Sequence, residues 1–292
     1  MLRSALRRCV VVLVVVALAH PAMAQDDDPT RLLRQPTVSQ NHIVFAHAGE
    51  LWRVGHNGGD AERLTSFPGV ASHPRLSPDG ERVAFSGQYN GQTDVYVVPV
   101  EGGTPERLTW HPGTDEVQGW APDGDRVLFT SGRDSAPAAY DRFWTVSLEG
   151  GKPSPLAIPR ADVGRYGPDG ERMVYQPIAR WQNHWRGYRG GQTHPLWIID
   201  LDDYGTTEIP FEGGIDTRPF WVGDTIYFVS DRTDMVRNVH AYDVEDGTVQ
   251  VLTNHTEFDV KTMGATEGTL VYEQGGRLHW LDPASGTSTT LD

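Results

Sequence analysis

A short run of apolar residues that ends in an aromatic side chain recurs along the chain. The copies are residues 43–45, 83–85, 127–129, 173–175, 226–228 and 270–272. Their aromatic residues are separated by 40, 44, 46, 53 and 44 positions. This is the period of four-stranded propeller blades, and it is longer than that of a helical hairpin repeat. The hydrophobic pattern therefore predicts six repeats of one β-sheet unit.

Tight turns and further strands complete each repeat. Residues 77–80, 121–124 and 167–170 each contain Pro-Asp-Gly, in which proline sets the first φ and glycine accepts a positive φ. A third strand rich in aromatic and β-branched residues follows, and then a glycine-rich turn and a short fourth strand such as 107–109. We expect an all-β fold, a six-bladed β-propeller of four-stranded antiparallel blades. The sequence leaves open how the ring closes, with packing between blades one and six without a shared strand as one alternative.

The first 24 residues differ from the repeats. Three arginines precede the apolar run 9–19, and Ala22-Met23-Ala24 ends in small residues. This pattern predicts a secretory signal peptide over 1–24, because the apolar run is too short to cross a bilayer. An acidic leader over 25–36 and the propeller over 37–292 follow. We expect a periplasmic or secreted protein with no membrane insertion after signal cleavage.

Composition narrows the chemistry of the mature chain. Cys9 is the only cysteine and lies in the signal, so disulfides are not expected. The formal net charge is -14, and removal of the three signal arginines leaves 22 basic against 39 acidic residues, or -17. This charge opposes binding to nucleic acid and to anionic membranes. We therefore exclude nucleic acid as a partner.

Several segments resemble known propeller families. Residues 94–99 and 101–109 resemble the repeats of TolB and of the dipeptidyl-peptidase amino-terminal type. Residues 120–124, 188–191, 221–232 and 271–276 together look like the first, six-bladed propeller of tricorn-type serine proteases. This closer resemblance runs from about Pro36 to Gly276.

The resemblance implies a family in which a seven-bladed propeller, a PDZ-like domain and a serine protease core follow the first propeller. The chain stops near where the second propeller would begin, so no catalytic residue of that core has a matching position here. The export signal also departs from the cytosolic archaeal prototype. The residues themselves show no G-x-S-x-G elbow, H-E-x-x-H helix, P-loop or mononucleotide glycine pattern. We expect no catalytic residue, no cofactor and no metal in this chain.

An aromatic and basic segment over 181–194 lengthens the fourth repeat. Its candidate contact residues are Trp181, Trp185, Arg186, Tyr188 and Arg189. Three roles stay open, of which a structural extension or interdomain contact is favoured. The second is a loop that grips an acidic or carboxy-terminal peptide end through its arginines and aromatic rings. The third and least favoured is metal binding by His184 and His194.

Other polar residues have structural interpretations. Arg133 and Arg232 follow the second strand of their repeats, where we expect them to tie adjacent blades through hydrogen bonds. The remaining histidines are scattered over different repeats, and we expect most of them on outer strands or loops.

Two functions follow from these observations. The first is a non-catalytic propeller module of an exported tricorn-like serine peptidase, present as a truncated or split chain. It would dock to the remaining protease domains and help channel peptides or products, and a homo-oligomer of the parent protein is left open. The alternative is a stand-alone, TolB-like periplasmic propeller that binds a protein partner as a scaffold.

Overall fold

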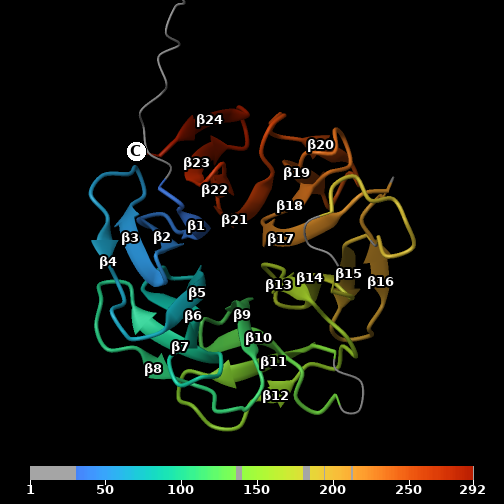
Figure 1. Ribbon diagram of the computed structural model, residues 1–292. Helices are drawn as coiled ribbons and strands as arrows, with labels where there is room; N and C mark the ends of the chain where they lie inside the picture. Colours follow the sequence, from blue (N-terminus) through green and yellow to red (C-terminus); the bar gives the residue numbers. More distant parts are fainter. Residues whose placement is uncertain (1–30, 136–139, 180–184, 194, 212, 292) are drawn as a thin grey trace, which may run out of the picture.

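The described part of the chain forms a ring of six blades around a central axis (Figure 1). The computed structural model describes residues 31–135, 140–179, 185–193, 195–211 and 213–291. In these residues 24 strands form six four-stranded antiparallel sheets, and no helix is present that could cross a membrane. The predicted fold class is confirmed. The predicted signal peptide lies outside the described residues.

Each blade uses four consecutive strands, ordered from the axis outward. Blades one and two contain β1 (Arg34–Val38), β2 (His42–His47), β3 (Glu50–Gly55), β4 (Glu62–Arg63), β5 (Val70–Leu76), β6 (Arg82–Gln88), β7 (Asp94–Pro99) and β8 (Glu106–Arg107). Blades three and four contain β9 (Asp115–Trp120), β10 (Arg126–Ser131), β11 (Arg142–Ser147), β12 (Ser154–Pro155), β13 (Val163–Tyr166), β14 (Arg172–Gln176), β15 (Trp197–Asp200) and β16 (Thr206–Glu208). Blades five and six contain β17 (Asp216–Val222), β18 (Thr225–Ser230), β19 (Asn238–Asp243), β20 (Val249–Val251), β21 (Val260–Thr266), β22 (Thr269–Gln274), β23 (Arg277–Asp282) and β24 (Thr287–Thr290).

The recurring aromatic residues of the second strands are the core of the ring. Phe85, Phe129 and Phe228 are fully buried in clusters of aliphatic side chains. The cluster around Phe85 joins Val44 of blade one to Val98 of blade two, so it fills the space between the two blades. Full burial of such a side chain contributes roughly 1.5–3 kcal/mol. The aromatic residue that recurs in the sequence therefore marks the buried core that each blade contributes.

Blades one and six close the ring without a shared strand among the described residues. The backbone N–H of Leu33 donates to the carbonyl oxygen of Gly276 at 3.1 Å. The backbone N–H of Gln35 donates to the carboxylate of Glu273, also at 3.1 Å. A buried cluster that includes Phe45 of blade one and Leu278 of blade six fills the seam. The sequence left the mode of closure open, and in the described residues the blades close the ring by packing.

The antiparallel order places the connections on two faces of the ring. Connections from first to second and from third to fourth strands lie on one face, here called the turn face. Connections from second to third strands and from one blade to the next lie on the other, here called the loop face. The Pro-Asp-Gly turns belong to the turn face, where the N–H of Gly80 donates to the carbonyl oxygen of Ser77 at 2.8 Å. The two faces thus carry different kinds of connection.

A β-bulge interrupts the innermost strands β1, β5 and β17. In each of them a residue with positive φ precedes a proline: Gln35 (53°), His73 (53°) and Arg218 (55°). Proline fits there because a residue in a bulge does not take part in the hydrogen bonds between strands, so the missing N–H of proline costs no bond. Gln35 and His73 then meet across two blades, since their Nε2 atoms are 3.2 Å apart. The bulges gather polar side chains around the axis.

Candidate functional sites on the loop face and at the axis

The large hydrophobic side chains that remain exposed are concentrated on the loop face. They are Leu32, Phe67, Val70, Trp110, Ile178, Trp185, Met235 and Phe258, all in connections of that face or at a strand end beside one. Of the exposed large hydrophobic residues in the described part of the chain, only Tyr204 lies in a connection of the turn face. Val251 lies on the outer strand β20. Scattered exposed apolar residues are normal, but a concentration on one face marks an interaction surface.

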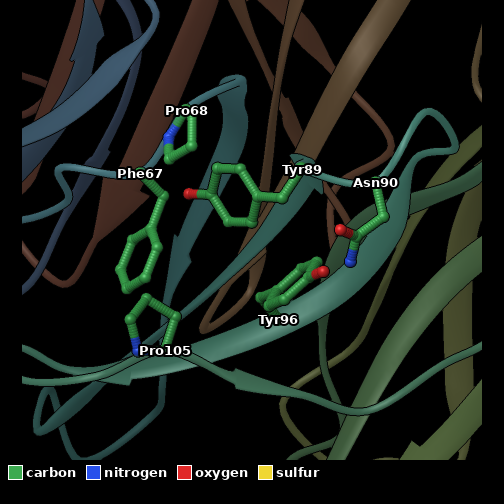
Figure 2. Close-up of a pocket in the computed structure, with 6 residues that line it drawn as sticks. All are labelled: Phe67, Pro68, Tyr89, Asn90, Tyr96 and Pro105. Carbon is green, nitrogen blue, oxygen red and sulfur yellow. The ribbon is translucent and has the colours of Figure 1, made fainter.

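An aromatic hollow opens between blades one and two on this face (Figure 2). Phe67 and Pro68 come from the connection between the blades, and Tyr89 and Asn90 follow β6. The Tyr89 ring lies 5.5 Å from the Phe67 ring and 5.0 Å from the Tyr96 ring, centroid to centroid. The hollow has a volume of about 260 Å³, below the roughly 300–1,000 Å³ of small-molecule pockets. Its size and apolar rim suit one protruding side chain of a protein partner.

The blade-four extension lies against blades five and six. Arg186 pairs with the buried Asp259 at 3.0 Å and donates to the carbonyl oxygen of Glu257 at 3.2 Å. Burial opposes ionisation of Asp259, but hydrogen bonds from the Arg237 N–H and the Arg186 guanidinium hold the pKa of its carboxyl below the usual value. Arg186 therefore ties its loop to the start of blade six.

Arg189 makes a second tie, to the fully buried Asp231 of blade five. Its Nη1 lies 3.2 Å from the Asp231 carboxylate, and its Nη2 donates to the Asp231 carbonyl oxygen at 2.8 Å. The same carboxylate accepts the backbone N–H groups of Gly187 and Ile215, at 2.9 and 2.8 Å. Asp231 thus anchors the extension to the ring.

The aromatic candidates of this segment are partly placed. Trp185 and Tyr188 pack with ring centroids 4.9 Å apart, and Trp185 is exposed. Trp181, His184 and His194 lie outside the described residues. A contact between this segment and a peptide stays a prediction. The described residues contain no group of three or more His, Cys, Asp or Glu side chains able to hold a metal ion.

Arg133 and Arg232 both bind neighbouring parts of the propeller. The expected hydrogen bond to an adjacent blade is found only for Arg232. Arg133 pairs with the fully buried Asp115, on the first strand of its own blade, and Arg232 likewise pairs with Asp216. Arg232 also donates to the carbonyl oxygen of Pro210 at 2.9 Å, in the connection from blade four. These arginines close their own blade because each follows the second strand at the loop face, where the first strand begins.

His73 is an exception to the expected outer position of the histidines, because the bulge of β5 brings it to the axis. Its Nδ1 lies 3.2 Å from the Ser72 Oγ, and its Nε2 lies 3.5 Å from a Glu116 oxygen. This Ser-His-Glu chain of contacts invites comparison with a catalytic triad. However, burial is the main cause that lowers the pKa of His73 to about 4, and the charges of Arg218, Arg75 and Arg165 act in the same direction, against Glu116. An imidazole that resists protonation is a poor general base near neutral pH.

Comparison with known proteins agrees with the repeat and the ring. A family model described as the tricorn protease N-terminal beta propeller domain matches residues 30–287. Tricorn protease homolog 1 of Streptomyces coelicolor is 35% identical over 263 residues, which cover 87% of this chain and 24% of that protein. The tricorn protease of Thermoplasma volcanium is 26% identical over 273 residues, which cover 89% of this chain and 26% of that protein.

Solved structures show the same architecture. The crystal structure of the tricorn protease superposes with a TM-score of 0.77 at 23% identity, over 90% of this chain and 26% of that one. TolB from Acinetobacter baumannii superposes with a TM-score of 0.65 at 17% identity, over 89% of this chain and 62% of that one.

Fold and sequence together define the protein as a six-bladed β-propeller domain of the tricorn type. The chain belongs to the family of tricorn protease N-terminal β-propeller domains. It spans about a quarter of the length of the curated relatives it matches.

Sequence reasoning missed the concentration of apolar residues on the loop face and the polar side chains at the axis. The residues of both sets come from different blades, and only ring closure brings them together. One signal was present: the pairs Gln35-Pro36, His73-Pro74 and Arg218-Pro219 stand at matching places in their repeats. They mark the bulges that direct side chains inward.

Proposed function

We propose that this chain is the non-catalytic propeller module of an exported tricorn-like serine peptidase and that its loop face docks the peptidase domains of the parent protein. The observation that carries this proposal is the asymmetry of the ring. Exposed apolar side chains such as Trp110 and Phe258 lie on the loop face. Apolar anchors surrounded by polar residues are the usual centre of a protein interface.

The turn face has the opposite character. In its Pro-Asp-Gly turns Asp123 pairs with Arg126 and Asp169 with Arg172, and these pairs remain largely exposed. Charged pairs of this kind are satisfied by each other and by water, so they give a partner little to bury. A protein partner therefore gains more from covering the loop face.

The family supports a docking role over a catalytic one. The relatives are named tricorn proteases, and this chain corresponds to about a quarter of their length. The Ser72, His73 and Glu116 contacts are unsuited to general base catalysis for the reason given above. We therefore assign peptide hydrolysis to other domains of the parent. Peptide hydrolysis by this chain, blocked by a serine-directed inhibitor, would overturn this assignment.

The docking proposal is tested by titrating the peptidase domains with this chain and with two variants. Trp110→Ser removes the side chain that is 66% exposed on the loop face. It should weaken association about tenfold, as loss of an aromatic anchor does. Tyr204→Ser, which removes an exposed aromatic side chain from the turn face, is the matched control and should leave affinity unchanged. Equal effects of both variants would contradict the proposal.

Channelling of peptides or products along the axis is a further part of the proposed function. The six innermost strands surround the axis (Figure 1), and polar side chains such as Gln35 and His73 line it. Arg75 of blade two and Phe220 of blade five meet there, since the Arg75 Cζ lies 5.6 Å from the Phe220 ring centroid. Passage of a peptide requires these side chains to move aside.

Export to the periplasm or beyond the cell remains a proposal that rests on the arginines and apolar run of residues 1–24. Sequencing the amino terminus of the mature protein tests it. A mature chain that begins at Gln25 supports export, and a chain that retains Met1 in the cytoplasm contradicts it.

The alternative, a stand-alone propeller that binds a protein partner, uses the same loop face. It draws on the general TolB-like fold. Sequencing beyond the codon for Asp292 separates the two functions. A second propeller and a serine protease core in frame, or in a neighbouring gene, favour the peptidase module, and their absence favours the scaffold.

A further inference from the structure

Three arginines from three blades surround the axis. Arg75 lies on β5, Arg165 on β13 and Arg218 at the bulge of β17. The Cζ atoms of Arg75 and Arg165 lie 5.6 and 4.5 Å from the centroid of the same Phe220 ring. We call these three residues the axial arginine cluster.

The cluster has fewer carboxylates than arginines. None of its three arginines forms an ion pair among the described residues, whereas Arg133, Arg189 and Arg232 each have a buried aspartate. Glu116 faces the cluster, but it lies 3.5 Å from the His73 Nε2. The axis therefore carries an excess of positive charge in a protein whose net charge is -14.

The hydrogen bonds of the cluster leave donors unused. Arg75 donates to the carbonyl oxygens of Gln118 and Pro74, at 3.0 and 2.7 Å. Arg165 donates through Nη1 to the carbonyl oxygen of Gly164 at 2.7 Å, and its buried Nε has no partner. A guanidinium has five N–H groups, so buried ones without acceptors are costly.

Electrostatics point the same way. Burial and the charge of Arg218 lower the pKa of Arg75 to about 9. Burial and the charges of Arg75 and Arg218 also lower the pKa of Arg165 well below its usual value. Like charges that lie close together with little solvent between them repel one another, and an added anion offsets that repulsion.

The backbone leaves room for these arginines. A Cβ on Gly119 would lie 3.3 Å from the Arg165 Cδ, so the absence of a side chain on β9 lets Arg165 reach the axis. Arg75 approaches the same strand through its bond to Gln118. The local sequence therefore admits two arginine side chains, one buried and one partly buried, beside one strand.

We propose that the axial arginine cluster binds a small oxyanion, a carboxylate or a phosphate, with Arg165 and Arg218 as its principal donors. Guanidinium groups bind both anions through paired, charge-assisted N–H bonds. The site gives the propeller a ligand-binding function distinct from docking on the loop face. It is measured on this chain by itself, so its failure would leave the docking proposal intact.

The test is thermal unfolding of the mature chain in inorganic phosphate, in acetate and in chloride, at equal ionic strength and constant pH. A specific anion raises the unfolding temperature in a saturable way, because ligand binding to the folded state stabilises it. We expect phosphate, acetate or both to stabilise the protein beyond chloride. Comparison of a peptide with its carboxy-terminal amide then shows whether a peptide carboxylate is the source.

Variants locate the site. Arg218→Gln should weaken the affinity for the anion about tenfold. Arg165→Gln removes a different donor and should weaken it as well. Arg75 is unsuitable because its bonds to two carbonyl oxygens support the fold. Arg160→Gln is the control of equal charge change, since Arg160 is exposed and stacks on Tyr140 away from the cluster. It should keep the full anion effect.

The proposal is overturned if neither anion stabilises the protein beyond chloride. It is also overturned if Arg160→Gln reduces the effect as much as Arg218→Gln does. Isothermal titration of folded Arg218→Gln and Arg165→Gln with the stabilising anion gives an independent reading. Retention of wild-type affinity in both would remove the cluster as the site.

Discussion

Arg75 of blade two lies over the Phe220 ring of blade five, with its Cζ 5.6 Å from the ring centroid. These residues belong to innermost strands, β5 and β17, on opposite sides of the six-bladed propeller (Figure 1). Their contact narrows the axis, and Arg165 packs on the same ring at 4.5 Å. The centre of the propeller is therefore a packed polar and aromatic layer at this level. Any molecule that crosses the ring must displace it.

Widening this layer should speed transit if the axis carries peptides. Phe220→Ala removes the ring that both arginines contact, so we expect the parent peptidase to release products faster during steady-state turnover. The variant must be compared at a temperature where it stays folded, because loss of a buried phenylalanine costs roughly 3–5 kcal/mol. Tyr204→Ala, far from the axis on the turn face, is the control. Unchanged product release in folded Phe220→Ala would argue against axial channelling.

Ring closure should depend on the missing side chain of Gly264. A Cβ there would lie 2.7 Å from the Thr37 Cα and 2.9 Å from the carbonyl oxygen of Pro36, both in blade one. Gly264→Ala should therefore push blades one and six apart and lower the free energy of unfolding by about 1–3 kcal/mol or more. Urea denaturation measures this loss.

Gly191→Ala is the matched control for the seam. A Cβ on Gly191 meets nothing within 4 Å, and this glycine has no positive φ. It should change the free energy of unfolding by less than about 0.5 kcal/mol. A Gly264→Ala protein as stable as Gly191→Ala would show that the seam is looser than the structure indicates.

The blade-four extension should be anchored chiefly by Asp231. Asp231→Ala leaves the N–H groups of Gly187 and Ile215 without their acceptor and deprives Arg189 of its carboxylate partner. We expect a loss of about 3 kcal/mol in the free energy of unfolding. Asp234→Ala, an exposed site in the same connection, should cost little. A small effect at Asp231, measured by urea denaturation, would mean that the extension is held by other contacts.

Stability should fall in mild acid because of His73 and His240. Burial is the main cause that lowers the pKa of each to about 4. As the pH falls below about 6.5, the unfolded chain takes up these protons before the folded one does, so folding is disfavoured. The loss grows down to about pH 4 and reaches roughly 3 kcal/mol for each group.

Urea denaturation between pH 7 and pH 4 checks this expectation. His240→Gln should flatten the decline, because the His240 ring is buried against Phe228, 5.5 Å away between centroids. The comparison uses the change of stability with pH, so a constant loss from the substitution does not matter. An identical pH dependence in the variant and the wild type would contradict the lowered pKa of His240.

The sequence predicted the architecture well because each blade repeats a local pattern. Apolar strands such as 83–85 and the Pro-Asp-Gly turns follow from neighbouring residues alone. The roles of Arg186 and Arg189 could not be derived in the same way, because their partners Asp259 and Asp231 stand far along the chain. A local composition of arginine and tryptophan indicates a contact but does not identify its partner.

The axial arginine cluster shows the same limit more clearly. Arg75, Arg165 and Arg218 are ordinary strand residues in their own repeats, and only closure of the ring brings them together. The loop face is likewise assembled from single exposed residues of many connections. A periodic sequence thus predicts the repeated unit, whereas the sites arise from the differences between repeats.

Hydrogen exchange of this chain, alone and within the parent peptidase, tests the docking claim most directly. The account predicts that connections of the loop face around Phe67, Trp110 and Phe258 gain protection in the parent protein. The turn-face segments 78–80, 122–124 and 168–170 should exchange as they do in the isolated chain. Protection confined to the turn face, or absent from both faces, would contradict docking through the loop face.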